Sequence, residues 1–312
     1  MIHGSIAPGW PRIAVMGAGA VGCYFGGMLA RAGASVTLIG RQSHVAAVNR
    51  DGLHLESMQF EERIRLSASS DASAAREAAV VLLCVKTLDT ETAAQTLAPY
   101  LAPDAIVASF QNGVDNVERI QAAAGIHAIP TAVYVAAEMV APGHVKHSGR
   151  GDLAIGVRRG GDRRELGEFA AIFTRAGVPC RISDNIEADL WIKLVMNCAY
   201  NAISALGHAR YGRAAHHQWT HAIMQRVTDE VIAVGRAAGV RFPDADVLDA
   251  VWKLGDAMPN AMSSTAQDVA RGKRTEIDSL NGYVARRGAE LGIPTPVNQT
   301  LHALVKLLEE AK

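Results

Sequence analysis

At 312 residues, the chain is long enough for two domains, and its 49% hydrophobic and 20% charged residues are typical of a globular protein. Its 31 Lys and Arg balance its 31 Asp and Glu, so no net charge favours nucleic acid or an anionic membrane as a partner. The sequence contains no apolar run of about 18 residues and its opening MIHGSIAPGWPR lacks a signal-peptide pattern, so we expect neither a membrane span nor secretion.

Short apolar runs alternate with helical patterns through the first 184 residues. Continuous apolar strands that alternate with helices are typical of a parallel, doubly wound sheet. The predicted strands are 12–17, 35–40, 79–86, 105–113 and 127–138, with an edge hairpin over 144–157 and a last strand at 178–183. Helical spacing occurs in 20–33, 89–98 and 115–124.

The pattern changes after residue 184, where strand signals stop. We therefore predict an α/β fold with two domains: a Rossmann-type, NADP-binding domain over 1–184 and an all-α substrate domain over 185–312. The predicted helices of the second domain are 185–206, 216–239, 244–256, 263–271, 275–291 and 297–311.

The hexamer GAGAVG follows the first strand and opens the first helix. In that context the pattern G-x-G-x-x-G indicates a dinucleotide site, because the glycines permit a tight turn, close approach of a pyrophosphate and close helix packing. A glycine-rich turn without a ligand is the simpler alternative. We expect the cofactor to contact the whole turn: Gly17, Ala18, Gly19, Ala20, Val21 and Gly22.

The second strand ends in Gly40 and Arg41, where a site that prefers NAD usually has an acidic residue. A guanidinium suits a 2′-phosphate, so we predict NADPH as the cofactor, against the alternative of an ordinary exposed arginine. Lys86 and Asn112 lie at the ends of the next two predicted strands, at the same edge of the sheet, where ligands bind. An isolated solvated lysine and a simple Asn-Gly turn are the alternatives there.

Lys193, Asn197 and Asn201 recur every fourth residue in a helix that is otherwise apolar, so they share one face. Burying an unpaired ammonium costs several kcal/mol, so this stripe is expected to face a polar site. A lysine there could also give a proton, because desolvation lowers its pKa. A stripe on an ordinary surface helix is the alternative.

The segment 262–282 holds a second group of polar residues. Ser264 and Gln267 fit the capping-box pattern S-x-x-Q, and capping explains Ser264 as well as ligand contact does. Glu276 and Asp278 are separated by one residue and point apart on a helix, so we expect one to be solvated and the other to face the site.

These features together resemble the ketopantoate reductase (2-dehydropantoate 2-reductase) family. The motifs that carry the likeness stand in the family's order: GAGAVG, Arg41, Lys86, QNG, WIKLVMNCAYN and SSTAQD with TEIDSLNG. The resemblance implies NADPH-dependent reduction of ketopantoate to pantoate, a step of pantothenate and coenzyme A synthesis. It also implies a site between a Rossmann half and a helical half.

Carried over by position, Lys193 resembles the family's general acid, which protonates the keto oxygen as hydride reaches the keto carbon. Glu276 resembles the acid that binds the substrate hydroxyl and the cofactor ribose. The resemblance assigns substrate contacts to Asn112, Asn197, Asn201 and Ser264, and cofactor contacts to Lys86, Asn112, Ala137 and Glu276.

Tyr211 stands where family members have another asparagine, which leaves the exact 2-keto acid open. A related β-hydroxyacid or imine dehydrogenase is the alternative enzyme, and a non-catalytic NADP sensor is the alternative from another class.

The four separated cysteines have no metal or redox spacing, so we expect small buried thiols in a cytoplasmic protein. The expected partner is a small keto acid, with no metal, and the helical half could form a homodimer.

Overall fold

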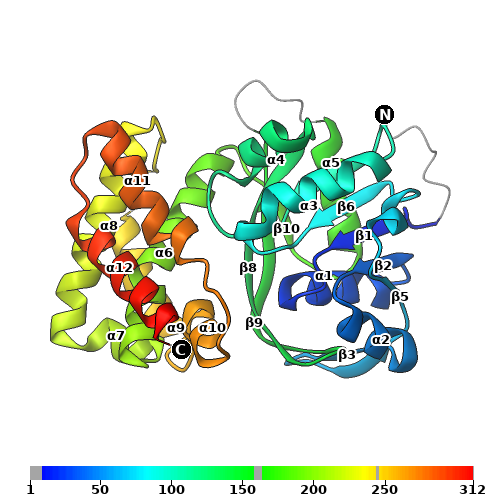
Figure 1. The fold of residues 1–312 in the computed structure, drawn as a ribbon, viewed down its shortest axis with the longest axis horizontal. Helices are drawn as coiled ribbons and strands as arrows, with labels where there is room; N and C mark the ends of the chain where they lie inside the picture. Colours follow the sequence, from blue (N-terminus) through cyan, green and yellow to red (C-terminus); the bar gives the residue numbers. More distant parts are fainter. Residues whose placement is uncertain (1–8, 158–163, 244–245, 312) are drawn as a thin grey trace. The chain divides into compact units, whose positions relative to one another are not determined.

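The computed structural model describes residues 9–157, 164–243 and 246–311. The lead-in through residue 8 and the predicted helix start at 244–245 lie outside these ranges. By contact, the chain divides into two compact units. Unit 1 comprises Met1–Gln111 and Asp115–Ile186, and unit 2 comprises Asn112–Val114 and Glu187–Lys312. Within the described ranges all strands lie in unit 1, and unit 2 is helical (Figure 1).

The centre of unit 1 is a parallel sheet in the strand order of a Rossmann fold. The order is β5 (Ser67–Ser69), β2 (Val36–Ile39), β1 (Ile13–Met16), β6 (Val80–Leu83), β7 (Ile106–Ser109) and β8 (Ala128–Ala141). The predicted Rossmann-type fold class and all-α second part are confirmed.

The sheet continues beyond β8 in mixed orientation. The next strands are β9 (His144–Ile155), antiparallel to β8, then β3 (Leu53–Glu56), β4 (Glu61–Ile64) and, off this path, β10 (Cys180–Ile182) on β9. The predicted edge hairpin over 144–157 is therefore wrong, because these residues form one strand inside the sheet. Their turn-like HSGRGD sequence is accommodated as bulges: Arg150 has φ 54°, and the pairing of β8 with β9 shifts register nearby.

Successive residues of the parallel strands point to opposite faces, and helices cover both. Ile13 and Val15 pack with Phe25 of α1 (Ala20–Arg31) and Phe169 of α5 (Arg164–Arg175). Ala14, between them, packs in a second core. That second core includes apolar residues of α3 (Thr90–Leu97) and α4 (Asn116–Ala124). The remaining helical pieces of unit 1 are α2 (Gln42–Asp51), η1 (Ala72–Ala75), η2 (Thr87–Asp89) and η3 (Ala98–Tyr100).

Unit 2 is built on the long helix α6 (Ile186–Gly207). Its other elements are α7 (Tyr211–His216), α8 (Gln218–Ala237), α9 (Val247–Ala257), α10 (Ser264–Ala270), η4 (Ile277–Ser279), α11 (Asn281–Leu291) and α12 (Pro296–Glu310). Helices α8, α11 and α12 pack together, with Val227, Val231 and Val234 on the buried face of α8. The predicted helix over 275–291 is corrected to a 3₁₀ turn and a helix, separated by the non-helical backbone of Leu280.

Candidate active site

The glycine turn between β1 and α1 is shaped by crowding in its own backbone. Gly17 has φ +107°, and a Cβ atom there would lie 2.6 Å from the Val85 amide nitrogen. A Cβ atom at Gly22 would overlap the Gly17 carbonyl oxygen and lie 2.9 Å from Val15 Cγ1. These two glycines are therefore required by the fold itself.

Gly19 is different, because nothing in the described part of the chain requires a glycine there. It has φ −87°, and a Cβ atom would meet no atom within 4 Å. Gly19 is the N-cap of α1, no side chain caps this helix end, and its first turn holds no acidic residue. A helix start of this kind suits an anionic group that approaches the backbone closely, which fits a dinucleotide pyrophosphate.

The end of β2 has no room for the acidic residue that NAD sites carry. A Cβ atom at Gly40 would lie 2.6 Å from Ala18 Cβ. Arg41 follows as the exposed N-cap residue of α2. Burial lowers the pKa of His44, and the charge of Arg41 lowers it further. His44 Nδ1 accepts a 2.9 Å hydrogen bond from the Gly143 amide, so the ring anchors α2 beside the turn between β8 and β9.

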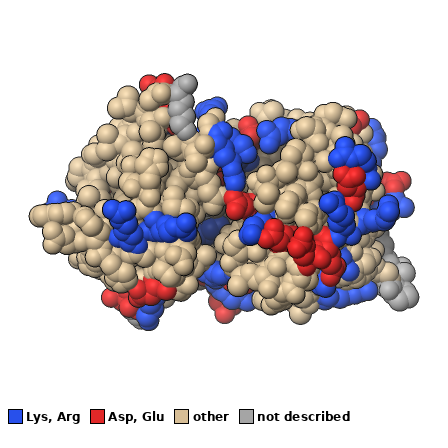
Figure 2. Space-filling model, turned by 90° about the horizontal axis from the view of Figure 1, so that it is seen from below, with Lys and Arg blue, Asp and Glu red and all other residues tan. Residues whose placement is uncertain are grey.

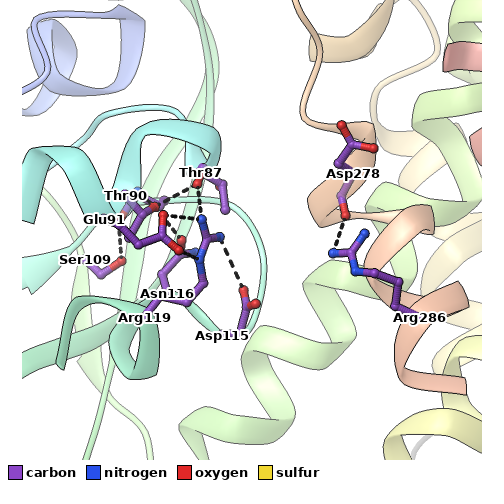
Figure 3. Close-up of polar contacts among 10 residues, drawn as sticks. Thr87, Thr90, Glu91, Ser109, Asp115, Asn116, Arg119, Asp278 and Arg286 are labelled. Atoms are coloured by element: carbon purple, nitrogen blue, oxygen red, sulfur yellow. Dashed lines mark hydrogen bonds and ion pairs between the residues drawn. The ribbon is translucent and has the colours of Figure 1, made fainter. Parts of the chain in front are cut away.

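A partly buried polar network joins the segments that follow β6 and β7, including the starts of α3 and α4 (Figure 3). Arg119 donates to both carboxylate oxygens of Glu91, at 2.6 and 2.8 Å, and to the Thr87 carbonyl at 2.7 Å. Gln111 Nε2 donates to Thr90 Oγ1 at 2.7 Å, and Thr90 Oγ1 donates to Asn116 at 3.0 Å. Arg119 is not among the predicted site residues; the signal for this network in the sequence is the polar Gln111 at the end of an apolar strand.

This network fixes the loops in which two predicted site residues lie. Lys86 is half-buried and is the N-cap of η2, directly before Thr87. Asn112 directly follows Gln111. Ala137, the remaining predicted cofactor contact, is half-buried in β8, opposite His147 of β9.

Asn112 and Glu276 are brought together within unit 2. Asn112 Nδ2 donates a 2.9 Å hydrogen bond to Glu276 Oε2, across 164 residues of sequence. Glu276 is half-buried and is the N-cap of η4. Asp278, the other acid of this motif, is half-buried and is bonded to His302 and Lys306 of α12.

The polar stripe lies on α6 as the spacing predicts. Lys193 and Asn197 are half-buried, and Asn201 is only 2% exposed. Of the apolar residues that flank them, Leu194 and Cys198 are buried, and Ile192 and Met196 are half-buried. One face of this 22-residue helix therefore carries an ammonium and two amides between apolar borders.

Ser263, not Ser264, caps α10, so the predicted capping box is wrong by one residue. Ser263 Oγ accepts from the Ala266 amide at 3.0 Å and donates to the Asn201 carbonyl at 3.2 Å. Gln267 Nε2 donates to the Met262 carbonyl instead of completing a box. Ser264 is exposed at the first position of the helix, so capping no longer explains it.

Tyr211 lies in the packing of unit 2. Its ring is 4.4 Å from that of Tyr200, and burial raises the pKa of its phenol. Tyr200 itself donates to the Val251 carbonyl at 2.7 Å. The two rings thus join the start of α7 to α6 and α9.

Other chemical features are plain in the described ranges. All four cysteines are free; Cys23 and Cys198 are buried, while Cys84 and Cys180 are half-buried, and burial raises the pKa of each. No described group of His, Cys, Asp or Glu could hold a metal ion. No described helix is both long enough and apolar enough to cross a membrane. Acidic and basic side chains both occur on the face drawn in Figure 2.

Comparison with known proteins gives matches over nearly the whole chain. A family model described as ketopantoate reductase PanE/ApbA matches residues 13–160, and the model of its C-terminal part matches 185–309. A 2-dehydropantoate 2-reductase of Halobacterium salinarum is 32% identical over 302 residues, covering 96% of this chain and 99% of that protein.

Solved structures agree with these matches. A crystal structure of a PanE/ApbA family ketopantoate reductase from Ralstonia eutropha JMP134 is 51% identical, with a TM-score of 0.90 over 96% of this chain and 99% of that one. A ternary structure of D-mandelate dehydrogenase with NADH and anilino(oxo)acetate has a TM-score of 0.91 over 96% and 98% of the two chains. At 23% identity, this second likeness supports the fold alone.

Proposed function

This chain belongs to the ketopantoate reductase family, and from that membership we propose that it reduces 2-dehydropantoate to pantoate with NADPH. The proposal is supported by matches to both halves of the chain and by relatives named 2-dehydropantoate 2-reductase. The hydrogen bond between Asn112 and Glu276 is the structural observation that supports it most, because it joins two polar residues from motifs 164 residues apart in the sequence.

The cofactor is assigned to unit 1. The first turn of α1 and Gly19 fit its pyrophosphate. Lys86 is assigned to the 2′-phosphate beside Arg41, Asn112 to the nicotinamide, and Ala137 to a further cofactor contact. The choice of NADPH over NADH depends on Arg41, which pairs with a 2′-phosphate, and on Gly40, where an acidic side chain would collide with Ala18. NADPH, when bound, supplies the hydride for the keto carbon.

Lys193 is assigned the role of general acid. As hydride reaches the keto carbon, negative charge builds on the keto oxygen, and an ammonium lowers the free energy of that charge and donates the proton. Asn197, Asn201 and Ser264 are assigned to the oxygen atoms of the substrate. Glu276, held by Asn112, is assigned to the substrate hydroxyl and the cofactor ribose.

The assignment of the two parts follows from these roles. Residues 1–184 provide most of the assigned NADPH contacts, and residues 185–312 most of the assigned keto-acid contacts. The exceptions are Asn112, assigned to both ligands, and Glu276, assigned also to the cofactor ribose. A cytoplasmic location agrees with the four free cysteines. A homodimer stays a prediction, and light scattering of the purified chain tests it.

Steady-state oxidation of NADPH tests the function. The wild-type chain is expected to reduce ketopantoate with a higher kcat/KM than its unsubstituted or aromatic analogues. Lys193→Ala is expected to lower kcat by a factor of about 10² to 10⁴, while the Kd for NADPH, measured by fluorescence, stays nearly unchanged. Lys253→Ala, at an exposed position of α9, is the control. A Lys193→Ala variant with near-wild-type kcat would refute the assignment of the acid.

A further inference from the structure

Asp278 is held by the last helix of the chain. His302 Nε2 donates to Asp278 Oδ1 at 2.7 Å, and Lys306 Nζ donates to Oδ2 at 3.0 Å. Burial alone would raise the pKa of Asp278, but these two bonds lower it below its ordinary value. The carboxylate therefore stays ionised, and the ion pair is only about a quarter to a third exposed, with side-chain exposures of 26% and 31%.

The same helix holds the other side of Glu276. Glu309 Oε1 accepts a 2.7 Å hydrogen bond from the Thr275 backbone amide, and Lys306 Nζ lies 2.9 Å from Glu309 Oε2. His302, Lys306 and Glu309 are four and three residues apart, so they share one face of α12. That face of α12 thus binds Thr275 and Asp278, which lie on either side of Glu276 in the sequence.

Space for this arrangement comes from Gly282. A Cβ atom there would lie 2.8 Å from both Cδ2 and Nε2 of His302. The single glycine of the TEIDSLNG motif therefore lets His302 approach Asp278. Arg286 Nη2 also donates to the Asp278 carbonyl at 2.9 Å, which fixes the backbone of the same turn (Figure 3).

An ordinary surface ion pair would not have these features. Lys253 and Asp249 pair at 2.7 Å within one helix, and their side chains are 75% and 51% exposed. The α12 contacts join two elements, are largely buried and flank one polar residue on both sides. Their geometry indicates that they control where Glu276 lies.

We propose that His302, Lys306 and Glu309 are positioning residues that hold the backbone around Glu276, so that its carboxylate stays bonded to Asn112. The importance of this role for turnover rests on the function proposed above. A small displacement of a catalytic group can lower the rate about 100-fold, so a loosened Glu276 would cost turnover even when the fold is intact.

A double-mutant cycle on kcat/KM for ketopantoate tests the coupling. Asp278→Ala is expected to lower kcat/KM by about 10- to 100-fold in the wild-type background and by less than about twofold in a Glu276→Gln background. Lys306→Met and His302→Leu should behave like Asp278→Ala, while Lys306→Arg and His302→Gln, which keep a donor, should recover most activity. Lys253→Met is the matched control. Equal losses in both backgrounds would overturn the proposal.

A second readout does not depend on turnover. The side-chain amide resonance of Asn112, assigned with Asn112→Asp, should shift in Asp278→Ala toward its position in Glu276→Gln, and should not move in Lys253→Met. An unmoved resonance in a folded Asp278→Ala chain would overturn the positioning role. A chain that lacks ketopantoate reduction but shows this shift would refute the proposed function and leave the positioning role supported.

Discussion

The glycine turn of unit 1 takes its shape from backbone atoms close by in the fold, whereas the segment from Thr275 to Gly282 in unit 2 is held by side chains of other helices. In the turn, Gly17 and Gly22 are required because Val85 and the Gly17 carbonyl leave no room for a Cβ atom. In unit 2, Asn281 Nδ2 donates to the Cys198 carbonyl of α6 at 3.2 Å and to Asn298 Oδ1 at 3.0 Å. The glycine turn thus depends on positions that have no side chain, whereas the segment from Thr275 to Gly282 depends on hydrogen bonds made by side chains.

The largest expected effect is a loss of stability when one methyl group is added to the glycine turn. Gly22→Ala is expected to destabilise the chain by about 3 kcal/mol, because the new Cβ meets backbone that cannot move away. Gly19→Ala is the matched control: its stability should change by less than about 0.5 kcal/mol, while NADPH binding weakens. Thermal unfolding and NADPH titration measure both, and a Gly22→Ala chain as stable as wild type would contradict the crowding argument.

The second-largest expected effect is a loss of stability when one side-chain amide is removed from the segment Thr275 to Gly282. Asn281 is fully buried, so Asn281→Ala leaves the Asn298 oxygen without this donor and is expected to cost about 2 kcal/mol. Gln225→Ala, at an exposed position of α8, is the control. Urea unfolding at neutral pH is the measurement. Equal stability of the two variants would show that the network does not hold this segment.

Arg41→Ala should affect ligand choice rather than folding. The Kd for NADPH is expected to rise about tenfold, a loss of about 1.4 kcal/mol, while the Kd for NADH changes little. Arg50→Ala, at the other end of α2, is the control. Fluorescence titration with both cofactors gives the values. Equal weakening of both cofactors would remove the 2′-phosphate argument.

The smallest expected effect is the pH dependence of the Asp278 contacts. The folded pKa of Asp278 lies below its ordinary value of 3.8, so its contribution is present above that value and is lost as pH falls through the folded pKa. The stability difference between wild type and Asp278→Asn, expected to be about 1 kcal/mol at pH 7, should therefore shrink as acid is added. Chemical unfolding from pH 7 to pH 3 measures it; a constant difference would assign the effect to packing.

The elements that sequence analysis found are those with a strong local pattern. β1, β6 and β7 are continuous apolar runs, and α6 and α8 carry long helical spacing. The strands β3, β4 and β5 were not predicted; they are about as short as β1, β6 and β7, but they contain polar residues, in the sequences LHLE, EERI and SAS. Strands without an apolar run depend on their pairing partners, here β9 for β3 and β2 for β5, which no local sequence window contains.

The same limit applies to the candidate site. Spacing alone placed Lys193, Asn197 and Asn201 on one helix face. It could not show that Ser263 would cap α10, because that choice is linked to a bond with the Asn201 carbonyl 62 residues earlier. Nor could it pair Asp278 with His302, since the approach depends on how two helices pack.

The central position of β9 has a consequence for synthesis. β3 pairs with β9 across 90 residues of sequence, as the Glu56–Lys146 contact illustrates. On the ribosome, a nascent chain that ends before residue 144 has made β3 and β4 but not the strand beside them. Closing so long a loop is slow, so residues 53–64 should gain protection from hydrogen exchange only in nascent chains long enough to include β9.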